Sequence, residues 1–151
     1  MKSSRSPRRR AREFAVQGLY QWLLAGGEPR EIARQVAEME GFARSDRPMF
    51  ESLWSGTVVT RNDLDALLAP HLDRAPEALS PIEHAILLLG AYELQSMPQT
   101  PYRVVINEAV ELAKSFGGTD GHKYVNGVLD KLAGRLRRPE IDAGRTPATQ
   151  P

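Results

Sequence analysis

Cysteine is absent from this chain of 151 residues. Its absence excludes disulfide bonds, thiolate zinc sites and cysteine nucleophiles, and it is compatible with a reducing compartment. Long apolar runs are missing too. The longest uninterrupted one, AILLLGAY at residues 85–92, falls well short of the roughly 20 residues that a membrane-spanning helix needs. We therefore expect a cytoplasmic protein that does not interact with membranes.

Acidic residues are absent from the first twelve positions, although the whole chain is almost balanced at a formal net charge of +1. This basic segment, residues 1–12, contains six cations: Lys2, Arg5, Arg8, Arg9, Arg10 and Arg12. Such a cluster is typical of a surface that binds phosphates, with an affinity that depends on salt. Two other interpretations remain open. The segment could be a solvated end in which Arg9 pairs with Glu13 at i, i+4, or an arginine-rich organelle transit peptide.

Signatures of enzymes are missing as well. The chain has no glycine-rich nucleotide-binding loop, no GxSxG elbow, no HExxH pair and no aspartate-rich calcium loop. The three histidines, His71, His84 and His122, have no i, i+4 spacing that would place two of them on one helix face. We therefore expect a binding protein with no catalytic residues, no metal site and no cofactor.

Helical signals run through the chain, whereas strand alternation and internal repeats do not. A serine or threonine precedes proline at residues 6–7, 80–81 and 100–101, which is typical of a capped helix start. Apolar residues then recur every three or four positions. The pattern predicts an all-α protein with helices at about residues 7–25, 29–40, 48–68 as one helix or two, 81–97, 101–116 and 120–137.

The helix expected at 81–97 is apolar on most of its faces, which predicts that it forms the buried centre of the protein. We expect one domain over residues 1–138. From Pro139 onward the sequence is short, polar and without helical periodicity, so residues 139–151 are expected to be a disordered tail.

A second candidate binding surface is SFGGTDGHKYVNG, residues 115–127, between the last two expected helices. Phe116 and Tyr124 have rings that can stack on bases, while His122 and Lys123 can meet phosphates near a helix N-terminus. A structural interpretation stays open beside this one. Phe116 could close a helix end, Asp120 could cap the next helix, and Tyr124 could belong to the core.

Three stretches together resemble the NusB family of bacterial transcription antitermination factors: RRRAREFAVQGLYQW, SPIEHAILLLGAYEL and PYRVVINEAVELAKSFGGTDGHKYVNGVLDKL. They cover most of the chain in the family's order, and residues 26–78 match only weakly. The resemblance implies about seven helices in two stacked small bundles and no enzymatic activity. It also implies pairing with NusE, a small-subunit ribosomal protein, and binding of the pair to boxA RNA. With NusA and NusG, the pair would help RNA polymerase read through terminators, chiefly in ribosomal RNA operons.

The resemblance also assigns residues to these surfaces. It implies RNA contacts at Lys2, Arg8, Arg9, Arg10, Arg12, Phe116, Asp120 and Tyr124. We add Lys123 as a phosphate contact because of its charge and its place near a helix N-terminus. The positions facing NusE are Tyr20, Glu77 and Glu83. Glu83 also stands three residues after Ser80, the spacing of a capping box, so helix cap and partner contact both remain open for it. His71 and the glycines at 118 and 121 depart from the family pattern, which leaves the loop geometry open.

One condition links the two RNA-binding parts. They form a single surface only if the start of the first helix lies beside the junction of the last two.

Other partners and functions also remain open. Some family members form homodimers, so we expect that this chain can pair with a second copy of itself. A ribosomal RNA methyltransferase that carries the same helical module is strongly disfavoured, because it needs a cysteine nucleophile and a cofactor-binding domain. The remaining alternative is a protein–protein adaptor whose arginines are merely solvated.

Overall fold

The computed structural model describes residues 5–118 and 120–145, and this part of the chain is helical without strands. Its α-helices and 3₁₀ turns are α1 (Pro7–Ala25), α2 (Pro29–Ala37), η1 (Phe42–Arg44), α3 (Arg47–Val59), α4 (Arg61–Leu68), η2 (Ala69–His71), η3 (Pro76–Ala78), α5 (Pro81–Ser96), α6 (Tyr102–Phe116), α7 (Gly121–Leu136) and α8 (Arg138–Arg145). The all-α prediction is confirmed. The described residues hold eight α-helices in place of about seven, because residues 48–68 divide into α3 and α4 and α8 follows α7.

Two of the three expected caps are present. The Ser6 hydroxyl accepts a hydrogen bond from the Arg9 amide at 3.0 Å, and the Ser80 hydroxyl accepts one from the Glu83 amide at 3.3 Å. Thr100 does not cap α6. The carboxylate of Glu140 in α8 instead accepts a hydrogen bond from the Tyr102 amide at 2.9 Å. The cap of α6 is therefore supplied from a distant part of the sequence.

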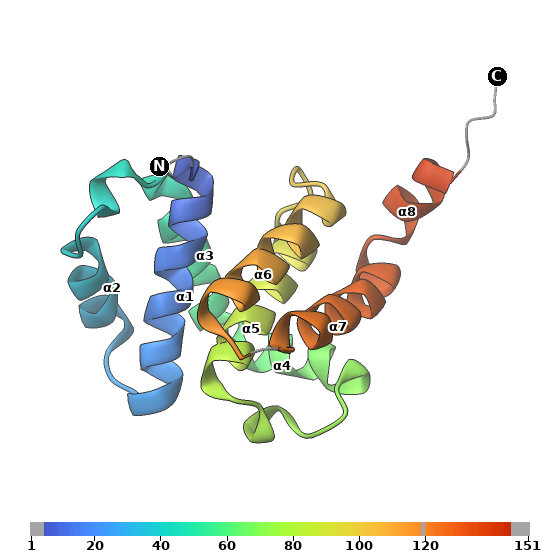
Figure 1. Ribbon diagram of the computed structural model, residues 1–151, viewed down its shortest axis with the longest axis horizontal. Helices are drawn as coiled ribbons and strands as arrows, with labels where there is room; N and C mark the ends of the chain where they lie inside the picture. Colours follow the sequence, from blue (N-terminus) through green and yellow to red (C-terminus); the bar gives the residue numbers. More distant parts are fainter. Residues whose placement is uncertain (1–4, 119, 146–151) are drawn as a thin grey trace.

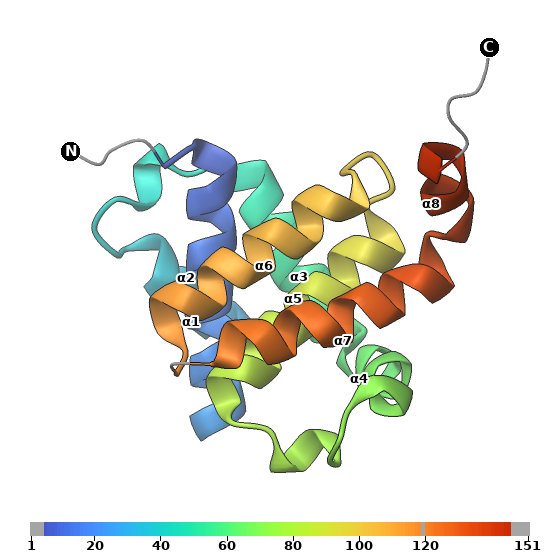
Figure 2. The ribbon, with the colours of Figure 1, turned by 45° about the vertical axis from the view of Figure 1, so that its right-hand side comes forward.

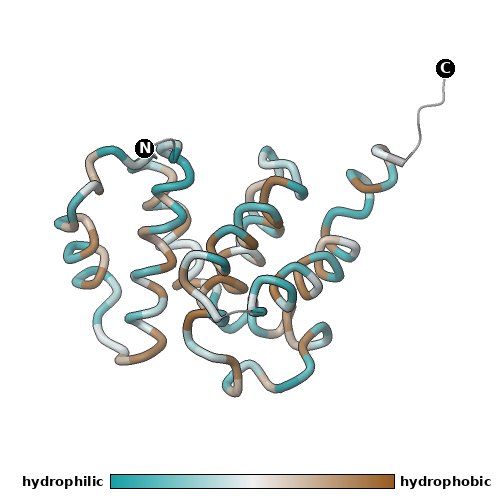
Figure 3. Tube along the Cα trace, viewed as in Figure 1, coloured by the Kyte–Doolittle hydropathy of each residue, from teal (hydrophilic) through white to brown (hydrophobic). Residues whose placement is uncertain are grey.

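The helices form two stacked bundles that share α5. Helices α1, α2 and α3 lie on one side of the molecule and α4, α6 and α7 on the other, as Figures 1 and 2 show. Helix α5 contacts α1, α3, α4, α6 and α7. Every residue from His84 to Ala91 is buried, which confirms α5 as the centre of the protein. Figure 3 shows hydrophobic and hydrophilic segments alternating along the helices, as amphipathic helices packed on a core require.

Glycines allow the neighbouring helices to approach α5 closely. A Cβ atom on Gly56 of α3 would lie 2.2 Å from the Tyr92 ring of α5. A Cβ on Gly90 of α5 would lie 2.8 Å from the side chain of Leu129 in α7. Both distances are shorter than van der Waals contact, so a larger residue at either position would push the bundles apart.

The expectation of a disordered tail from Pro139 is wrong for residues 139–145, which belong to α8. This helix has little intrinsic apolar pattern, and tertiary contacts hold it: Glu140 caps α6 and pairs with Arg137, and Ile141 packs against the core. Residues 146–151 of the expected tail lie outside the described residues. No helix in the described part is long and apolar enough to cross a membrane.

Candidate nucleic-acid and partner interface

Arg12, expected at the RNA surface, lies inside the protein. Its side chain is 4% exposed and that of Glu93 on α5 is 2% exposed. The guanidinium donates two hydrogen bonds to the Glu93 carboxylate, Nε to Oε2 at 2.7 Å and Nη2 to Oε1 at 2.9 Å. Because this pair joins α1 to the central helix and is closed to solvent, direct RNA contact by Arg12 is not compatible with the structure.

Arg9 is also engaged, although at the surface. It donates two hydrogen bonds to the Glu108 carboxylate of α6, at 2.9 and 2.8 Å, and these bonds raise the pKa of Arg9. The expected pairing of Arg9 with Glu13 is wrong, because Glu13 pairs with Arg5 at 3.4 Å. Arg9 keeps 37% of its side chain exposed, so it lies at the edge of the basic region with much of its charge compensated.

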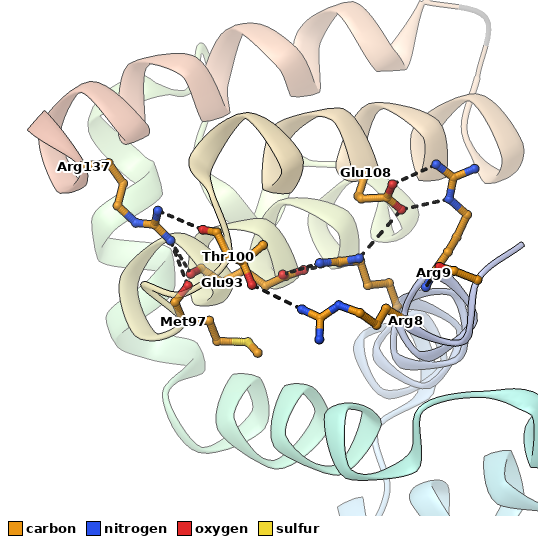
Figure 4. A network of polar contacts seen from close by, with 9 residues as sticks. Arg8, Arg9, Glu93, Met97, Thr100, Glu108 and Arg137 are labelled. Atoms are coloured by element: carbon orange, nitrogen blue, oxygen red, sulfur yellow. Dashed lines mark hydrogen bonds and ion pairs between the residues drawn. The ribbon is translucent and has the colours of Figure 1, made fainter. Parts of the chain in front are cut away.

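Arg8 and Arg10 remain uncompensated. Arg8 is exposed and makes one long hydrogen bond, from Nη2 to the Thr100 hydroxyl at 3.4 Å, as Figure 4 shows. Arg10 lies next to Gly41, where the Nη1 of Arg10 and the Nη2 of Arg44 are 3.8 and 3.5 Å from the position of a Cβ atom. Arg44 is exposed on η1. Among the described residues, no carboxylate pairs with Arg8, Arg10 or Arg44, and we call these three residues the basic surface.

Arg44 was not predicted from the sequence. It lies in the region of weak family resemblance, and its approach to Arg10 depends on how η1 folds back. The Asp46 amide donates a hydrogen bond to the Pro7 carbonyl at 2.9 Å, which fixes the loop before α3 to the start of α1. Local sequence patterns carry no sign of this contact. Lys2, the remaining predicted cation of the first segment, lies outside the described residues.

Phe116 and Tyr20, predicted for RNA and for NusE respectively, share one hollow. They line a groove of about 500 Å³ together with Leu24 and Met39, and we call these four residues the apolar groove. Their exposed fractions run from 38% for Tyr20 and Phe116 to 61% for Leu24. Only two other large hydrophobic residues of the described chain, Val59 and Val104, are exposed. The exposed apolar surface is therefore concentrated between α1, α2 and the end of α6.

Tyr124 is tied to the loop that follows α4. Its hydroxyl donates to the Asp73 carboxylate at 2.9 Å and accepts from the Asp73 amide at 3.3 Å. The Arg74 guanidinium lies 5.1 Å from the centre of the Tyr124 ring. Hydrogen bonds from Arg74 and Tyr124 lower the pKa of Asp73 to about 2, while burial raises the pKa of Tyr124. Tyr124 is thus half-buried, with its hydroxyl already bonded inside the protein.

Asp120 and Glu83 lie on either side of the α7 start. Asp120 makes no capping hydrogen bond and pairs with Lys123 at 3.6 Å, with both side chains more than 70% exposed. The Glu83 carboxylate lies beside Gly121, where a Cβ atom would be 2.7 Å from Oε2. Glu83 is therefore half-buried between α5 and α7, while Glu77 is exposed on η3.

The start of α1, which carries Arg8 and Arg10, and the α6–α7 junction are at different positions along the contact between α1 and α6, and they do not touch. The start of α1 faces the middle of α6 through Arg9 and Glu108, whereas Phe116 at the end of α6 faces Tyr20. A polar cleft between these two contacts contains Glu13, Glu108 and Glu111. Figure 2 shows the end of α6 crossing α1. The two predicted parts are therefore about 18 Å apart along α1, taken from residue 8 to residue 20.

Within residues 5–118 and 120–145, no three histidine, aspartate or glutamate side chains are grouped closely enough to hold a metal ion. The His84 ring, buried on α5, contacts Asp65 at 2.7 Å. Burial raises the pKa of Asp65, but hydrogen bonds from His84 and Arg61 outweigh it and lower the pKa overall. This contact joins α4 to α5, so we assign His84 and Asp65 a structural role rather than a place in the binding surfaces described above.

The chain is similar to proteins of one family throughout its folded part. Residues 9–134 match the model of the NusB family. The chain is 56% identical over 144 residues to the transcription antitermination protein NusB of Aromatoleum aromaticum, covering 95% of this chain and 99% of that protein. The corresponding protein of Azoarcus sp. strain BH72 is also 56% identical, over 95% of this chain and 93% of its own length.

Solved structures agree with this similarity. The fold is similar to that of T. maritima NusB, with a TM-score of 0.78 and 26% identity over 94% of this chain and 99% of that one. A crystal structure of the antitermination factors NusB and NusE in complex with dsRNA has a chain with a TM-score of 0.74 and 27% identity, covering 84% of this chain and 96% of that chain. The protein described here belongs to the NusB family.

Proposed function

We propose that this protein is a transcription antitermination factor that binds boxA RNA of nascent ribosomal RNA transcripts together with NusE. The observation that carries the proposal is the basic surface, where Arg10 and Arg44 approach each other at Gly41, Arg8 lies on the same first turns of α1, and none of the three guanidinium groups has a carboxylate partner among the described residues. Family membership and the similarity to a NusB chain crystallised with NusE and RNA support it. In this role the protein links the RNA, through NusE, NusA and NusG, to RNA polymerase in the cytoplasm.

The basic surface acts through phosphate contacts. Arg8, Arg10 and Arg44 supply positive charge and forked donors, which suit phosphate oxygens. Arg9 contributes less, because Glu108 already takes two of its donors. Lys2, Asp120, Lys123, Phe116 and Tyr124 remain proposed RNA contacts. Since Asp120 is acidic, its contact would be to a base edge rather than to a phosphate.

The variant Arg8→Gln/Arg10→Gln/Arg44→Gln tests the RNA surface. We expect its affinity for a labelled boxA RNA in the presence of NusE to fall roughly tenfold to a hundredfold near physiological salt. The slope of log affinity against log salt should decrease by about 2, because each phosphate contact to a single strand contributes about 0.7. Fluorescence anisotropy over a salt series, with and without NusE, measures both quantities.

A charge-matched control is Arg30→Gln/Arg34→Gln/Arg138→Gln, which removes three exposed arginines from α2 and α8. It should bind RNA like the wild type. If the two triple variants bind equally well, the arginines of the basic surface are only solvated, and the adaptor interpretation replaces RNA binding.

The apolar groove is the proposed contact with NusE. It contains most of the exposed large hydrophobic side chains of the described residues, and clustered apolar exposure of this kind marks protein interaction sites. Tyr20 and Phe116 provide two aromatic rings, a residue type enriched at interface centres. Glu83 and Glu77 remain proposed charged contacts with NusE. In the absence of NusE, the same groove is available to a second copy of the chain, which is the proposed homodimer contact.

Leu24→Glu tests the groove. Because Leu24 is 61% exposed, a carboxylate there should leave the fold intact while lowering NusE affinity by at least about tenfold, since it places an unpaired charge in an apolar contact. Isothermal titration calorimetry with NusE measures the affinity, and analytical ultracentrifugation of the free variant measures self-association.

Val59→Glu is the matched control, because Val59 is 81% exposed and also lies in the last turn of a helix. If Val59→Glu weakens NusE binding and Leu24→Glu does not, the partner docks between α2 and α3 instead.

A further inference from the structure

Helix α7 carries a basic stripe that extends beyond the surfaces above, which include Lys123 but neither Lys131 nor Arg135. Lys123, Gly127, Lys131 and Arg135 follow one another at intervals of four residues, and all four are exposed. Residues at this spacing lie on one helix face, each about 6 Å further along the axis. We call these four residues the α7 stripe. His71 and Leu72 face its middle, where they line a hollow of about 370 Å³ with Lys123, Gly127 and Lys131.

The charge on the α7 stripe is scarcely compensated. Among the described residues, Lys131 and Arg135 have no carboxylate partner, and Lys123 has only the exposed contact with Asp120, which is weak in solvent. The acid that lines the hollow, Asp73, is engaged by Arg74 and Tyr124. Asp130 lies in a different hollow, toward α6.

The pKa of His71 is affected by the positive charges of the α7 stripe. Its pKa is lowered, mainly by burial and further by the charges of Arg135 and Lys131. The His71 Nε2 atom is buried without a hydrogen-bond partner among the described residues. Both cations therefore lie close to a neutral imidazole, and the one carboxylate on the wall opposite the α7 stripe, that of Asp73, is bonded to Arg74 and Tyr124.

Gly127 opens the centre of the stripe. A Cβ atom there would meet no atom within 4 Å, and the backbone is helical with no positive φ. Neither packing nor backbone conformation requires glycine at this position, although glycine weakens a helix interior. The absence of a side chain leaves room for another chain to approach the helix backbone between Lys123 and Lys131.

We propose that the α7 stripe binds the sugar–phosphate backbone of single-stranded RNA that flanks boxA. This inference rests on the proposed RNA-binding function. A positive track with an aromatic at its end, here Tyr124, is the usual arrangement for holding a single strand without reading its sequence. The stripe starts in the α6–α7 region already proposed to contact boxA, so the RNA continues along α7.

A protein or a membrane fits this surface less well. Interface centres and membrane-binding helices present several exposed apolar side chains. Of the aliphatic residues lining this hollow, Leu72 is half-buried, Val128 is buried and only Pro70 is exposed. The exposed groups are instead two lysines, an arginine and a glycine, separated by whole helical turns. This combination is suited to repeated phosphates.

Two RNAs and one double variant test the proposal. The wild type and Lys131→Gln/Arg135→Gln are compared, each with NusE, on boxA alone and on boxA extended by flanking single strand on both sides. We expect the wild type to bind the extended RNA more tightly and with a steeper salt dependence. The variant should bind boxA like the wild type, bind the extended RNA about threefold to tenfold more weakly, and lose about 1.4 from its salt slope on that RNA.

The control Arg30→Gln/Arg34→Gln removes two exposed charges from α2, on the other side of the molecule in Figure 1, and should bind both RNAs like the wild type. Equal binding of the extended RNA by wild type and Lys131→Gln/Arg135→Gln would overturn the proposal. An equal loss on both RNAs would overturn it too, since the stripe would then contact boxA itself. If the wild type binds neither RNA, the proposed function fails as well.

Discussion

Replacing Arg12 by methionine is expected to lower the free energy of unfolding by about 3–5 kcal/mol, because the Glu93 carboxylate would be left buried with no charged partner. Glu93 is 2% exposed, and among the described residues Arg12 donates both side-chain hydrogen bonds that its carboxylate accepts. Urea unfolding followed by circular dichroism measures the loss. A decrease of less than about 1 kcal/mol would show that the pair is not buried in solution.

The double variant Arg12→Met/Glu93→Leu separates charge from packing. Removing both charges eliminates the unpaired carboxylate, so most of the stability should return. Arg9→Met is the control at the surface, where the partly exposed pair with Glu108 should contribute only about 1 kcal/mol. If the double variant is as unstable as Arg12→Met, the loss arises from the packing of α1 on α5.

Replacing Arg137 by methionine should cost about 3–4 kcal/mol, or roughly 10 °C in Tm for a chain of this size. Arg137 is 6% exposed and donates hydrogen bonds to the carbonyls of Leu94 at 2.8 Å, Met97 at 3.0 Å, Thr100 at 3.0 Å and Glu93 at 3.2 Å. The Glu93 and Leu94 carbonyls belong to the last turn of α5, and those of Met97 and Thr100 to the segment before α6. Two of the four also accept a backbone hydrogen bond, Glu93 from the Met97 amide and Met97 from the Thr100 amide. Without the guanidinium each of the four buried carbonyls would lose a hydrogen bond, and those of Leu94 and Thr100 would have no backbone bond among the described residues in its place.

Calorimetry of Arg137→Met, Arg137→Lys and Arg138→Met measures this effect. Lysine keeps the charge but lacks the planar fork, so Arg137→Lys should fall between the methionine variant and the wild type. Arg138 is exposed on α8, and Arg138→Met should change stability by less than about 0.5 kcal/mol. Equal losses for Arg137→Met and Arg138→Met would refute the role assigned to the buried fork.

The helices could be predicted because their signals are local. Apolar spacing, capping hydroxyls and prolines placed α1, α5, α6 and α7 within a residue or two of their observed ends. Helix α8 was missed because its stability comes from Glu140 and Ile141 contacting distant elements, which leaves no periodic pattern in eight residues. A short polar helix held by tertiary contacts looks like a tail in the sequence.

The burial of Arg12 could have been predicted from its helical spacing, although its charge suggested an exposed position. Arg12 precedes Val16 and Leu19 by four and seven residues, so it lies on the buried face of α1. Glu93, an acid near the end of an otherwise apolar helix, is the matching sign on α5. Both residues break the apolar pattern at core positions, and together they indicate a buried ion pair. The approach of Arg44 to Arg10 had no comparable sign, because it depends on a long-range turn.

The bonds at Glu93 also constrain the order in which the protein folds during synthesis. Figure 4 shows Arg8 from the first helix and Arg137 from the end of α7 both reaching this end of α5. Chains fold from the N-terminus as they emerge from the ribosome. Helix α1 can therefore dock on α5 early, but the Leu94 and Thr100 carbonyls lack their hydrogen bonds from Arg137 until residue 137 has left the exit tunnel. Completion of the native state must therefore follow the emergence of residue 137 from the ribosome.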